Sequence, residues 1–564
     1  MCATCLPPSA FRLPPSAFRL VEPVSPALLS KCELNGLDPP RGVQGHLQAL
    51  AGGVRPLILP GSVSAVPLRV RLASPTADPD GELPFRILVV ADAAGRRLPA
   101  PLGQRQPMTL GTGGIAALLA VVAPRISGTV EGISYDLDWT APAGPDRAGC
   151  IAGIVGLDAL ERRRRDPVAP VVERALLAER IARLIAAVRE QPGPRRLEAL
   201  WRSLAWLAEH AGHGVELALL PATREELDED LGDAPDPSAS GLFRTVYSDE
   251  YGQHGGRPWA LLVTDLLCGA QARDAAVLRR LAALGNLAHT PVLAGAAPGL
   301  LGLADWPGLA EVRDVSAALA GGAAAWPALR GHDDARHAAL VLPPPPLRAP
   351  LLAGADRLWG LAALVLAARL ADCHARCGWT AAAAGSGSEA EVALPSPDDF
   401  AAVAGAEATP ATACLLTEEQ ARDLAANGLV PLCASRLRPT GAFPAIPTLH
   451  RGGQADDQLP LLMLADRIAH HLKVLQRERL GGNIDRAGLE RGLSEWLGRH
   501  VADGQLSDPA LRAVRPLCGA TVRVEEVAGR AGWMRAALTI RPHLPGAASD
   551  IELALTGRLD REPR

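Results

Sequence analysis

Residues 243–265 read FRTVYSDEYGQHGGRPWALLVTD and decide the fold of the region around them. Two of the three tyrosines lie here, in a chain with only 3% aromatic residues, so we expect a tightly packed element. Phe243, Val246 and Tyr247 recur at helical spacing. The glycines that follow predict the end of this helix and a turn. The apolar run 258–264 has the length of a strand that ends at Asp265. The predicted order is therefore helix, glycine turn and buried strand.

The same stretch resembles the most characteristic block of the large subunit of the type VI secretion contractile sheath. The block combines aromatic residues, two acidic residues and a glycine turn in an order that chance rarely produces. The residues of this chain that match it are Phe243, Val246, Tyr247, Glu250, Tyr251, Gly252, Gly255, Gly256, Pro258 and Asp265.

Four further blocks follow the order of that family, and the resemblance covers residues 180–558. They lie at residues 197–204, 288–292, 466–473 and 538–543. The matching positions are Trp201, His289, Pro291, Arg467, His470, Lys473, Arg541, Pro542 and His543. The chain departs from the family pattern at Ile468 and His471, where both aromatic residues are lost, and at Leu544, which replaces a glutamine.

The preceding part of the chain is similar to the small subunit of the same sheath. Residues 82–92 read ELPFRILVVAD and match its strand, with Leu83, Pro84, Phe85 and Asp92 at the characteristic positions. Residues 66–174 also follow its outline of strands and helices. The two resemblances together imply a natural fusion of the small and large sheath subunits.

The chain divides into three predicted parts. Residues 1–60 are a Pro-rich extension, expected to be disordered, in which the heptad PPSAFRL occurs twice in tandem. Residues 61–175 are the small-subunit-like domain and residues 176–564 the large-subunit-like domain. The predicted fold class is α/β of the mixed α+β kind: mixed sheets with flanking helices, and terminal strands for sheet exchange between protomers.

Secondary structure follows from periodicity and from turn residues. Strands are expected at 65–72, 83–91, 129–139, 519–527, 533–541 and 550–557. Helices are expected at 115–122, 170–189, 197–210, 459–480 and 486–501, and strands alternate with helices up to about residue 435. The uncharged run 281–304 is interpreted as a helix end, a turn and a buried strand, and the run 358–368 as a core helix. The prolines at 343–346 are predicted to form a stiff surface connection.

Composition excludes several classes of function. The 57 basic and 61 acidic residues nearly balance, which argues against the clustered positive charge that nucleic-acid binding needs. No basic segment followed by a long apolar core marks an export signal. The ten cysteines are ordinary usage for a reduced compartment. We therefore expect a cytoplasmic protein that neither binds nucleic acid nor inserts into a membrane.

Several cysteine, histidine and glycine patterns partly resemble metal-binding or phosphate-binding motifs. Cys2 and Cys5 have no second pair at zinc-ribbon spacing. Cys373 and Cys377 share a helical face, but a structural zinc needs four ligands, so core packing is favoured. The pair His210 and His213 and the glycine run 111–114 lack the remainder of a metal or phosphate signature. No catalytic, cofactor-binding or metal-binding residue is predicted.

His470 is predicted to be a structural histidine in the helix 459–480. Asp466 lies one turn before it on the same helical face and is a candidate hydrogen-bond partner. An acid-base pair is the functional alternative, and the structural reading is favoured.

The resemblance implies a mechanical function. Sheath protomers stack into a helical tube around an inner tube and contract to drive it outward. The implied partners are further copies of the chain, the inner-tube protein, the baseplate and a recycling AAA+ unfoldase. The chain runs almost directly from its first part into the first helix pair, without the segment where the family's unfoldase engages. The alternatives are a sheath-like component or adaptor of another contractile injection machine, and an enzyme with a cryptic site in the α/β domain.

The C-terminal strand is expected to connect protomers. A strand at residues 551–555, close to a chain end, offers its main-chain groups to the sheet of a neighbour. Such hydrogen bonds hold subunits together without fixing their orientation. We therefore hypothesise that this strand is donated or received during assembly.

Overall fold

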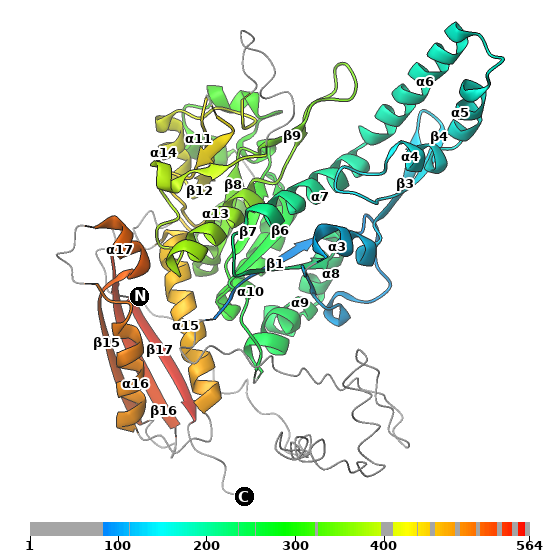
Figure 1. Ribbon diagram of the computed structural model, residues 1–564. Helices are drawn as coiled ribbons and strands as arrows, with labels where there is room; N and C mark the ends of the chain where they lie inside the picture. The colour runs from blue at the N-terminus through cyan, green and yellow to red at the C-terminus, as the bar shows by residue number, and fades with distance from the viewer. Residues whose placement is uncertain are drawn as a thin grey trace, which may run out of the picture. The chain divides into compact units, whose positions relative to one another are not determined.

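A computed structural model describes residues 83–111, 113–234, 236–253, 255–321, 325–395, 410–436, 438–451, 457–479, 486–502, 508–526, 533–543 and 551–558 (Figure 1). The predicted extension 1–60, the predicted strand 65–72 and the pair Cys2 and Cys5 lie outside these residues. Residues Gly81–Arg564 form one compact unit.

A seven-stranded sheet forms the centre of this unit. Its strand order is β12-β8-β7-β6-β1-β5-β2. The strands are β12 (Leu429–Pro431), β8 (Ala338–Leu342), β7 (Val292–Ala296), β6 (Leu261–Cys268), β1 (Phe85–Ala91), β5 (Val215–Pro221) and β2 (Met108–Thr109). Neighbouring strands are parallel except for the short edge strand β2, which is antiparallel to β5. This confirms the predicted mixed α/β fold.

Strand β1 lies in the middle of this sheet although it comes from the small-subunit-like part. Phe85 to Ala91 pair with Val215 to Pro221 of β5, and Ile87 to Val90 pair with Leu261 to Thr264 of β6. Every residue of β1 is buried. Parallel strands covered on both faces read as continuous apolar runs, which explains its sequence. The two predicted parts of the chain thus share one sheet and one compact unit.

The sheet separates two hydrophobic cores, and β1 contributes alternate residues to each. Phe85, Ile87 and Val89 face the first core, whereas Leu88 and Val90 face the second. Helices α3 (Gly114–Val122), α7 (Pro192–His210) and α13 (Ala362–Cys377) cover the first face. Helices α8 (Arg224–Asp233) and α10 (Ala272–Ala288) cover the second. The sheet is therefore a layer between two helical layers (Figure 1).

A second group of elements lies between β2 and α7. It comprises the hairpin β3 (Arg125–Val130) and β4 (Ile133–Asp138), then α4 (Arg147–Gly153), α5 (Leu157–Arg165) and α6 (Val171–Arg189). The strand predicted at 129–139 corresponds to β4, but it begins only at Ile133, because Glu131 and Gly132 both adopt positive φ and turn the chain from β3 into β4. Sequence periodicity does not reveal such a turn when one of its residues is a glutamate.

The C-terminal region has a third core of its own. Helices α15 (Leu459–Arg479), α16 (Arg486–Gly498) and α17 (Pro509–Val514) accompany a three-stranded antiparallel sheet in the order β15-β16-β17. Its strands are β15 (Leu517–Glu526), β16 (Trp533–Pro542) and β17 (Ile551–Arg558). Leu464 and Ile468 of α15 pack with Leu493 of α16 and Leu538 of β16. The predicted helices and strands of this region are confirmed.

Shorter elements complete the unit. They are α9 (Gly241–Phe243), the π-helical segment Arg244–Tyr251, α11 (Val315–Ala320), α12 (Ala325–Arg330), α14 (Glu418–Ala426), the strand pair β9 (Pro346–Arg348) and β10 (Leu358–Trp359), and the small sheet of β11 (Val392–Ala393), β13 (Cys433–Ala434) and β14 (Thr440–Ala442). Short 3₁₀ segments lie at Leu102–Gln104, Pro237–Ala239, Pro298–Leu301, Pro307–Glu311, Asp333–His337 and Ser388–Ala390.

Two predictions, one for the prolines at 343–346 and one for the end of strand β6, were wrong. The prolines at 343–346 are all buried between β8 and β9, so they do not form a surface connection. Strand β6 does not end at Asp265 but continues to Cys268, with an irregular register against β7 beyond Val263. The predictions for the two apolar runs are confirmed. The run 281–304 contains the end of α10 and strand β7, and most of the run 358–368 lies in α13, which follows β10. Within the ranges given above, no helix combines the length and apolar composition that crossing a bilayer requires.

Candidate assembly site around strand β1

The sequence blocks singled out above converge on the two ends of β1. At its amino end, helix α15 lies across the edge of the sheet. Arg467 of α15 donates from Nη2 to the carbonyl of Leu83, at 2.6 Å. Tyr251 donates to the carbonyl of Ala469, also in α15, at 3.4 Å. Three blocks that are far apart in the sequence therefore meet where β1 enters the sheet.

His470 is buried, as expected of a structural residue, but its hydrogen-bond partner is not Asp466. Its Nε2 lies 3.1 Å from the carbonyl of Ala288, at the end of α10. Asp466 instead contacts His289 and His337, so the candidate pairing of Asp466 with His470 was wrong. Spacing of four residues places two side chains on one helical face, but the neighbouring elements decide which groups they reach. Burial lowers the pKa of His470 to about 3, which keeps the imidazole neutral.

Aromatic rings connect these blocks further. Phe243 stacks on Tyr247 with centroids 4.9 Å apart, and Tyr247 meets Tyr251 edge-on at 5.1 Å. Tyr251 in turn meets His470 edge-on at 5.0 Å. Offset and edge-on pairs are the favoured geometries of aromatic rings, so this row contributes packing energy beyond its buried area. The predicted helical face of residues 243–247 is thus confirmed, although its backbone is π-helical from Arg244.

Arg86 is the charged residue of β1, and it is held at the amino end by the glycine-turn block. Its Nη1 lies 3.2 Å from Glu250 Oε2, and its Nε lies 3.1 Å from Glu216. Its guanidinium carbon lies 3.7 Å from the centroid of the Trp259 ring. Burial lowers the pKa of Arg86, and the carboxylate of Glu250 opposes that shift. We call Arg86, Glu250 and Trp259 the Arg86 clamp.

The glycine turn allows the clamp to form. A Cβ at Gly256 would lie 1.9 Å from the carbonyl oxygen of Glu250, so no larger residue fits there without moving the backbone. The backbone amide of Arg257 donates to Glu250 Oε2 at 3.2 Å. Gly255 has a φ of +74°, a region that favours glycine. The turn therefore fixes the carboxylate that receives Arg86.

The block at 197–204 and the end of the block at 243–265 meet at the carboxyl end of β1. The backbone amide of Asp92 donates to Asp265 Oδ2 at 3.1 Å, and Trp201 donates from Nε1 to the carbonyl of Ala93 at 3.1 Å. Arg196 pairs with the carboxylate of Asp92. Both ends of β1 are therefore fastened by side chains from the large-subunit-like part.

The carboxyl of Asp265 gives this end a pH dependence. Burial, together with the charge of Asp92, raises its pKa from 3.8 to about 6. Because the folded-state pKa exceeds the unfolded value, its contribution to stability is present below about pH 4 and is lost as the pH rises through 6. Asp265→Asn keeps an oxygen for the Asp92 amide. We expect it to raise the free energy of unfolding at pH 7.5 by about 1–2 kcal/mol, and by nearly nothing at pH 4.

Thermal unfolding of both proteins across this pH range checks that expectation. Asp233→Asn, which changes an exposed carboxylate, is the matched control and should show no such divergence. Equal curves for Asp265→Asn and the unchanged protein at every pH would contradict the assignment.

Some of the predicted site residues lie elsewhere. Arg541, Pro542 and His543 lie at the end of β16, where His543 Nε2 is 3.3 Å from the carbonyl of Ala502. Lys473 is half-buried in α15. Pro291 precedes β7, and its carbonyl accepts from the Leu262 amide at 2.9 Å. Gly252 and Pro258 belong to the turn between the π-helical segment and β6.

Of the two cysteines of α13, Cys373 is part of the core, as predicted, whereas Cys377 is half-buried. Cys373 is 1% exposed, and its thiol donates to the carbonyl of Trp379 at 3.4 Å. His374 lies between the two cysteines in sequence and packs on Phe85 of β1, with centroids 4.7 Å apart. Burial lowers the pKa of His374 to about 3, so the ring is neutral.

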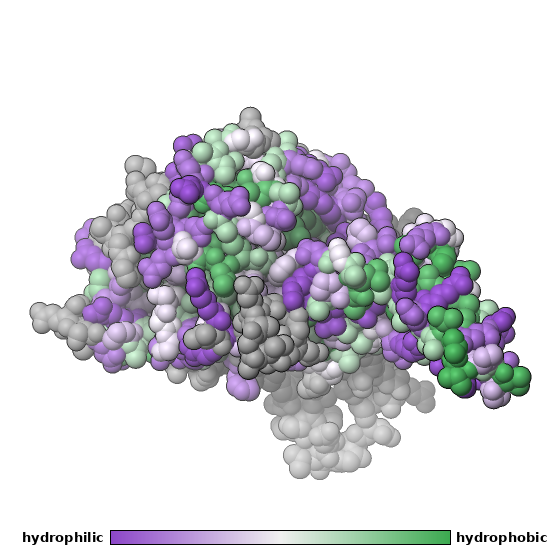
Figure 2. Space-filling view, turned by 90° about the horizontal axis from the view of Figure 1, so that it is seen from above, coloured by the Kyte–Doolittle hydropathy of each residue, from purple (hydrophilic) through white to green (hydrophobic). Residues whose placement is uncertain are grey.

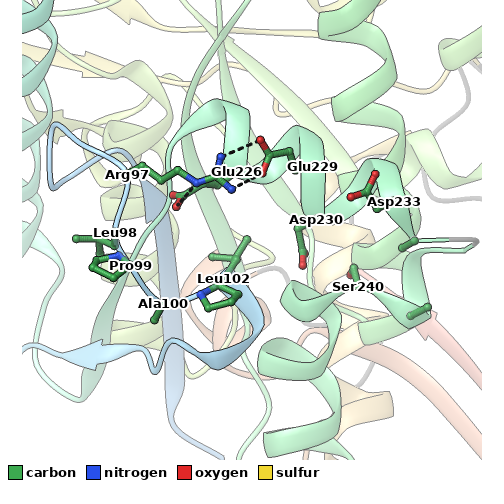
Figure 3. A pocket seen from close by; sticks show the side chains of 13 residues that line it. Arg97, Leu98, Pro99, Ala100, Leu102, Glu226, Glu229, Asp230, Asp233 and Ser240 are labelled. Atoms are coloured by element: carbon green, nitrogen blue, oxygen red, sulfur yellow. Dashed lines mark hydrogen bonds and ion pairs between the residues drawn. The ribbon is translucent and has the colours of Figure 1, made fainter.

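A cleft of 440 Å³ lies between residues 97–102 and helix α8 (Figure 3). It is lined by four carboxylates, and three of them already have partners. Glu226 accepts from Arg105 at 2.8 Å, Glu229 from Arg97 at 2.9 Å, and Asp230 from the amide of Gly241 at 2.8 Å. Glu226 fixes α8 to the segment that follows β1, and Asp230 fixes α8 to α9, whereas Glu229 pairs with Arg97 in solvent. We therefore assign the cleft a structural role.

Exposed apolar side chains gather around α5 and α6. Of the nine large hydrophobic residues that are exposed within the described ranges, five lie between residues 155 and 176: Val155, Val168, Val171, Val172 and Leu176. Val168, between the two helices, is 88% exposed. Figure 2 shows hydrophobic residues at this end of the molecule. Clusters of this kind are typical of protein–protein contacts.

Sequence reasoning missed Arg86, Glu216 and His337. The sequence could have indicated a role for Arg86, because a single arginine within an otherwise apolar buried strand needs an acidic or hydrogen-bonding partner. The other two give no such signal, since their partners lie far away in the chain.

Two family models match the chain. The EvpB/VC_A0108 tail sheath N-terminal domain matches residues 174–354 and 352–450, and the EvpB/VC_A0108 tail sheath gpW/gp25-like domain matches residues 452–559. The type VI secretion system sheath protein TssC1 of Pseudomonas aeruginosa is 26% identical over 403 residues, which cover 65% of this chain and 80% of that protein.

Solved structures give weaker similarities. The anti-feeding prophage baseplate structure contains a chain with a TM-score of 0.41 at 13% identity, covering 87% of this chain and 99% of that one. The contracted PVC sheath complex of an extracellular contractile injection system gives 0.33 at 14% identity, covering 65% and 77%. The sheath tail protein of Desulfitobacterium hafniense gives 0.29 at 13% identity, covering 53% and 56%.

Proposed function

Because the chain belongs to the EvpB/VC_A0108 tail sheath family and is a structural subunit of a type VI secretion sheath, we propose that it polymerises into a helical tube around an inner tube. Contraction of this tube propels the inner tube. In this proposal the chain is a mechanical component and catalyses no reaction. Its partners are further copies of itself, the inner-tube protein and the baseplate, and it works in the cytoplasm. The resemblance also implies a recycling AAA+ unfoldase, although the sequence departs from the family at the segment where that unfoldase engages.

The fusion is the part of the proposal that is specific to this chain. Residues 61–175 act as the small subunit and residues 176–564 as the large subunit. The observation that carries it is the position of β1 between β5 and β6, with both its ends fastened by residues of the large-subunit-like part. The start of the family match at residue 174 supports the boundary.

A fusion has a physical consequence for assembly. Joining the two parts in one chain fixes their ratio at one to one and makes their association intramolecular. In a two-chain sheath the same strand would have to be captured from solution. The exposed apolar residues of α5 and α6 supply surface that a polymer subunit can bury against a neighbour.

We expect the full chain, expressed alone, to form tubes or stacked rings without an added small subunit. Negative-stain electron microscopy of the purified protein is the measurement. As a control, a chain that lacks residues 61–175 loses β1 and should not yield folded protein unless that segment is supplied separately. Assembly that strictly requires an added small subunit would show that the fusion proposal is wrong. Assembly only after addition of the inner-tube protein would identify that protein as the template.

A further inference from the structure

A cluster of two histidines and one aspartate lies at the amino edge of the sheet, where α15 crosses it. His289 ends α10 just before β7, His337 ends the 3₁₀ segment just before β8, and Asp466 is in α15. His289 Nδ1 is 2.9 Å from Asp466 Oδ1, and His337 Nε2 is 3.4 Å from the same carboxylate. One ligand atom from each of the three residues lies within 4.8 Å of the other two.

These spacings suit a shared metal ion. Zinc binds histidine nitrogen and carboxylate oxygen at about 2.0–2.2 Å, so ligand atoms at tetrahedral angles lie roughly 3.3 Å apart. The three side chains come from three different elements, and the fold therefore brings them together before any ion is bound. His289 adopts a φ of +54°, which ends α10 and turns its ring toward Asp466.

The hydrogen bonds within the cluster do not satisfy all of its buried polar atoms. Asp466 and His337 are 4% and 6% exposed. Among the described residues, Asp466 Oδ2 is a buried atom without a hydrogen-bond partner. Buried polar atoms rarely remain unpaired, because the loss of hydration costs about 1–3 kcal/mol for each group. Asp466 Oδ2 lies 3.4 Å from His337 Nε2 but accepts no hydrogen bond, so this oxygen retains capacity to coordinate an ion.

We propose that His289, His337 and Asp466 bind one divalent first-row transition-metal ion, of which Zn²⁺ is the representative. Both imidazoles bind through the nitrogen that faces Asp466, and a water molecule completes the coordination. The side chain of His289 is 38% exposed, so it provides the route by which the ion and the water enter. Two histidines, one carboxylate and an open position form a known type of protein metal site.

The ion would connect three segments that also meet through hydrogen bonds such as His470 to Ala288 and Asn286 to Asp334. Through Asp466 it ties α15 to the residues that precede β7 and β8. Helix α15 also packs in the third core, so the ion fastens the C-terminal region to the sheet. Loss of the ion should therefore loosen α15 before it loosens the sheet.

The test is Zn²⁺ binding to the purified full chain after treatment with a chelator, measured by competition with a chromophoric chelator. We expect one tight equivalent per chain and a rise in the unfolding temperature on addition of Zn²⁺. His289→Gln changes the least buried ligand and should weaken this binding at least tenfold while circular dichroism stays unchanged. Co²⁺ bound in place of Zn²⁺ should give visible absorption of a low-coordinate site, which the same variant removes.

Control variants distinguish Zn²⁺ binding at this cluster from Zn²⁺ binding by other histidines or by cysteines. His450 is 2.9 Å from Asp457, and the described residues place no second imidazole beside that pair. His450→Gln should therefore leave the tight equivalent intact, as should the replacement of Cys2 and Cys5 by serine. Absence of a tight equivalent, or a tight equivalent that persists in both His289→Gln and Asp466→Asn, would overturn the proposal. The proposal concerns ion binding by the protomer, so failure of tube formation has no bearing on it.

Discussion

Removal of residues 549–564 is expected to abolish tube formation while leaving the protomer folded. This deletion removes β17, which pairs with β16 from Trp533 and Arg558 to Ile540 and Ile551. β17 is the outer strand of its sheet, so its second edge has main-chain groups available for another chain. Strand pairing between protomers would survive the rearrangement of a contracting tube, because it does not fix rigid-body orientation.

Two measurements are needed for that deletion. Negative-stain electron microscopy reports tubes, and hydrogen exchange of β1 and β6 reports whether the central sheet remains folded. Deletion of residues 1–60 is the control, because this extension is predicted to be disordered and its loss should leave tubes intact. Tubes formed by the chain without β17 would show that strand exchange at this terminus is wrong.

Replacement of Glu250 by alanine is expected to destabilise the protomer by about 3–5 kcal/mol. The side chains of Arg86 and Glu250 are each 4% exposed, and Glu250 is the buried carboxylate of the pair. Its removal leaves a buried guanidinium with only the half-buried Glu216, and it also leaves the Arg257 amide without its acceptor. An uncompensated buried charge costs far more than a lost surface ion pair.

Urea unfolding at pH 7.5 is the measurement for this substitution. Glu229→Ala is the matched control, because Glu229 pairs with Arg97 in solvent and its loss should have no measurable effect. The double replacement of Arg86 and Glu250 by leucine should recover part of the stability lost in Glu250→Ala, since it removes the unpaired charge. A loss below 1 kcal/mol for Glu250→Ala would mean that the Arg86 clamp does not hold β1.

Elements with strong periodicity were predicted well. The helices α6, α7 and α15 and the strands β1, β15, β16 and β17 lie within a few residues of their expected positions. Each has an apolar pattern long enough to distinguish a period of 3.6 from a period of 2.

Long-range partners were predicted poorly. The sequence places Asp466 beside His470, yet the fold pairs it with His289 and His337, which are 177 and 129 residues away. The buried position of the prolines at 343–346 was likewise missed, because a proline run reads as a surface connection until β8 and β9 enclose it. The hairpin β3–β4 was missed because its turn contains Glu131, a residue that rarely adopts positive φ.

The amino-acid sequence by itself determined the family, the mixed α/β class and the main helices and strands. These depend on residue types at short spacing, where periodicity and turn chemistry act locally. Only the tertiary structure decided that β1 is enclosed between β5 and β6, that Arg86 and Glu250 form a buried pair, and that His289, His337 and Asp466 form one cluster. Such contacts join residues more than a hundred positions apart, and their geometry exists only after the sheet and α15 have packed together.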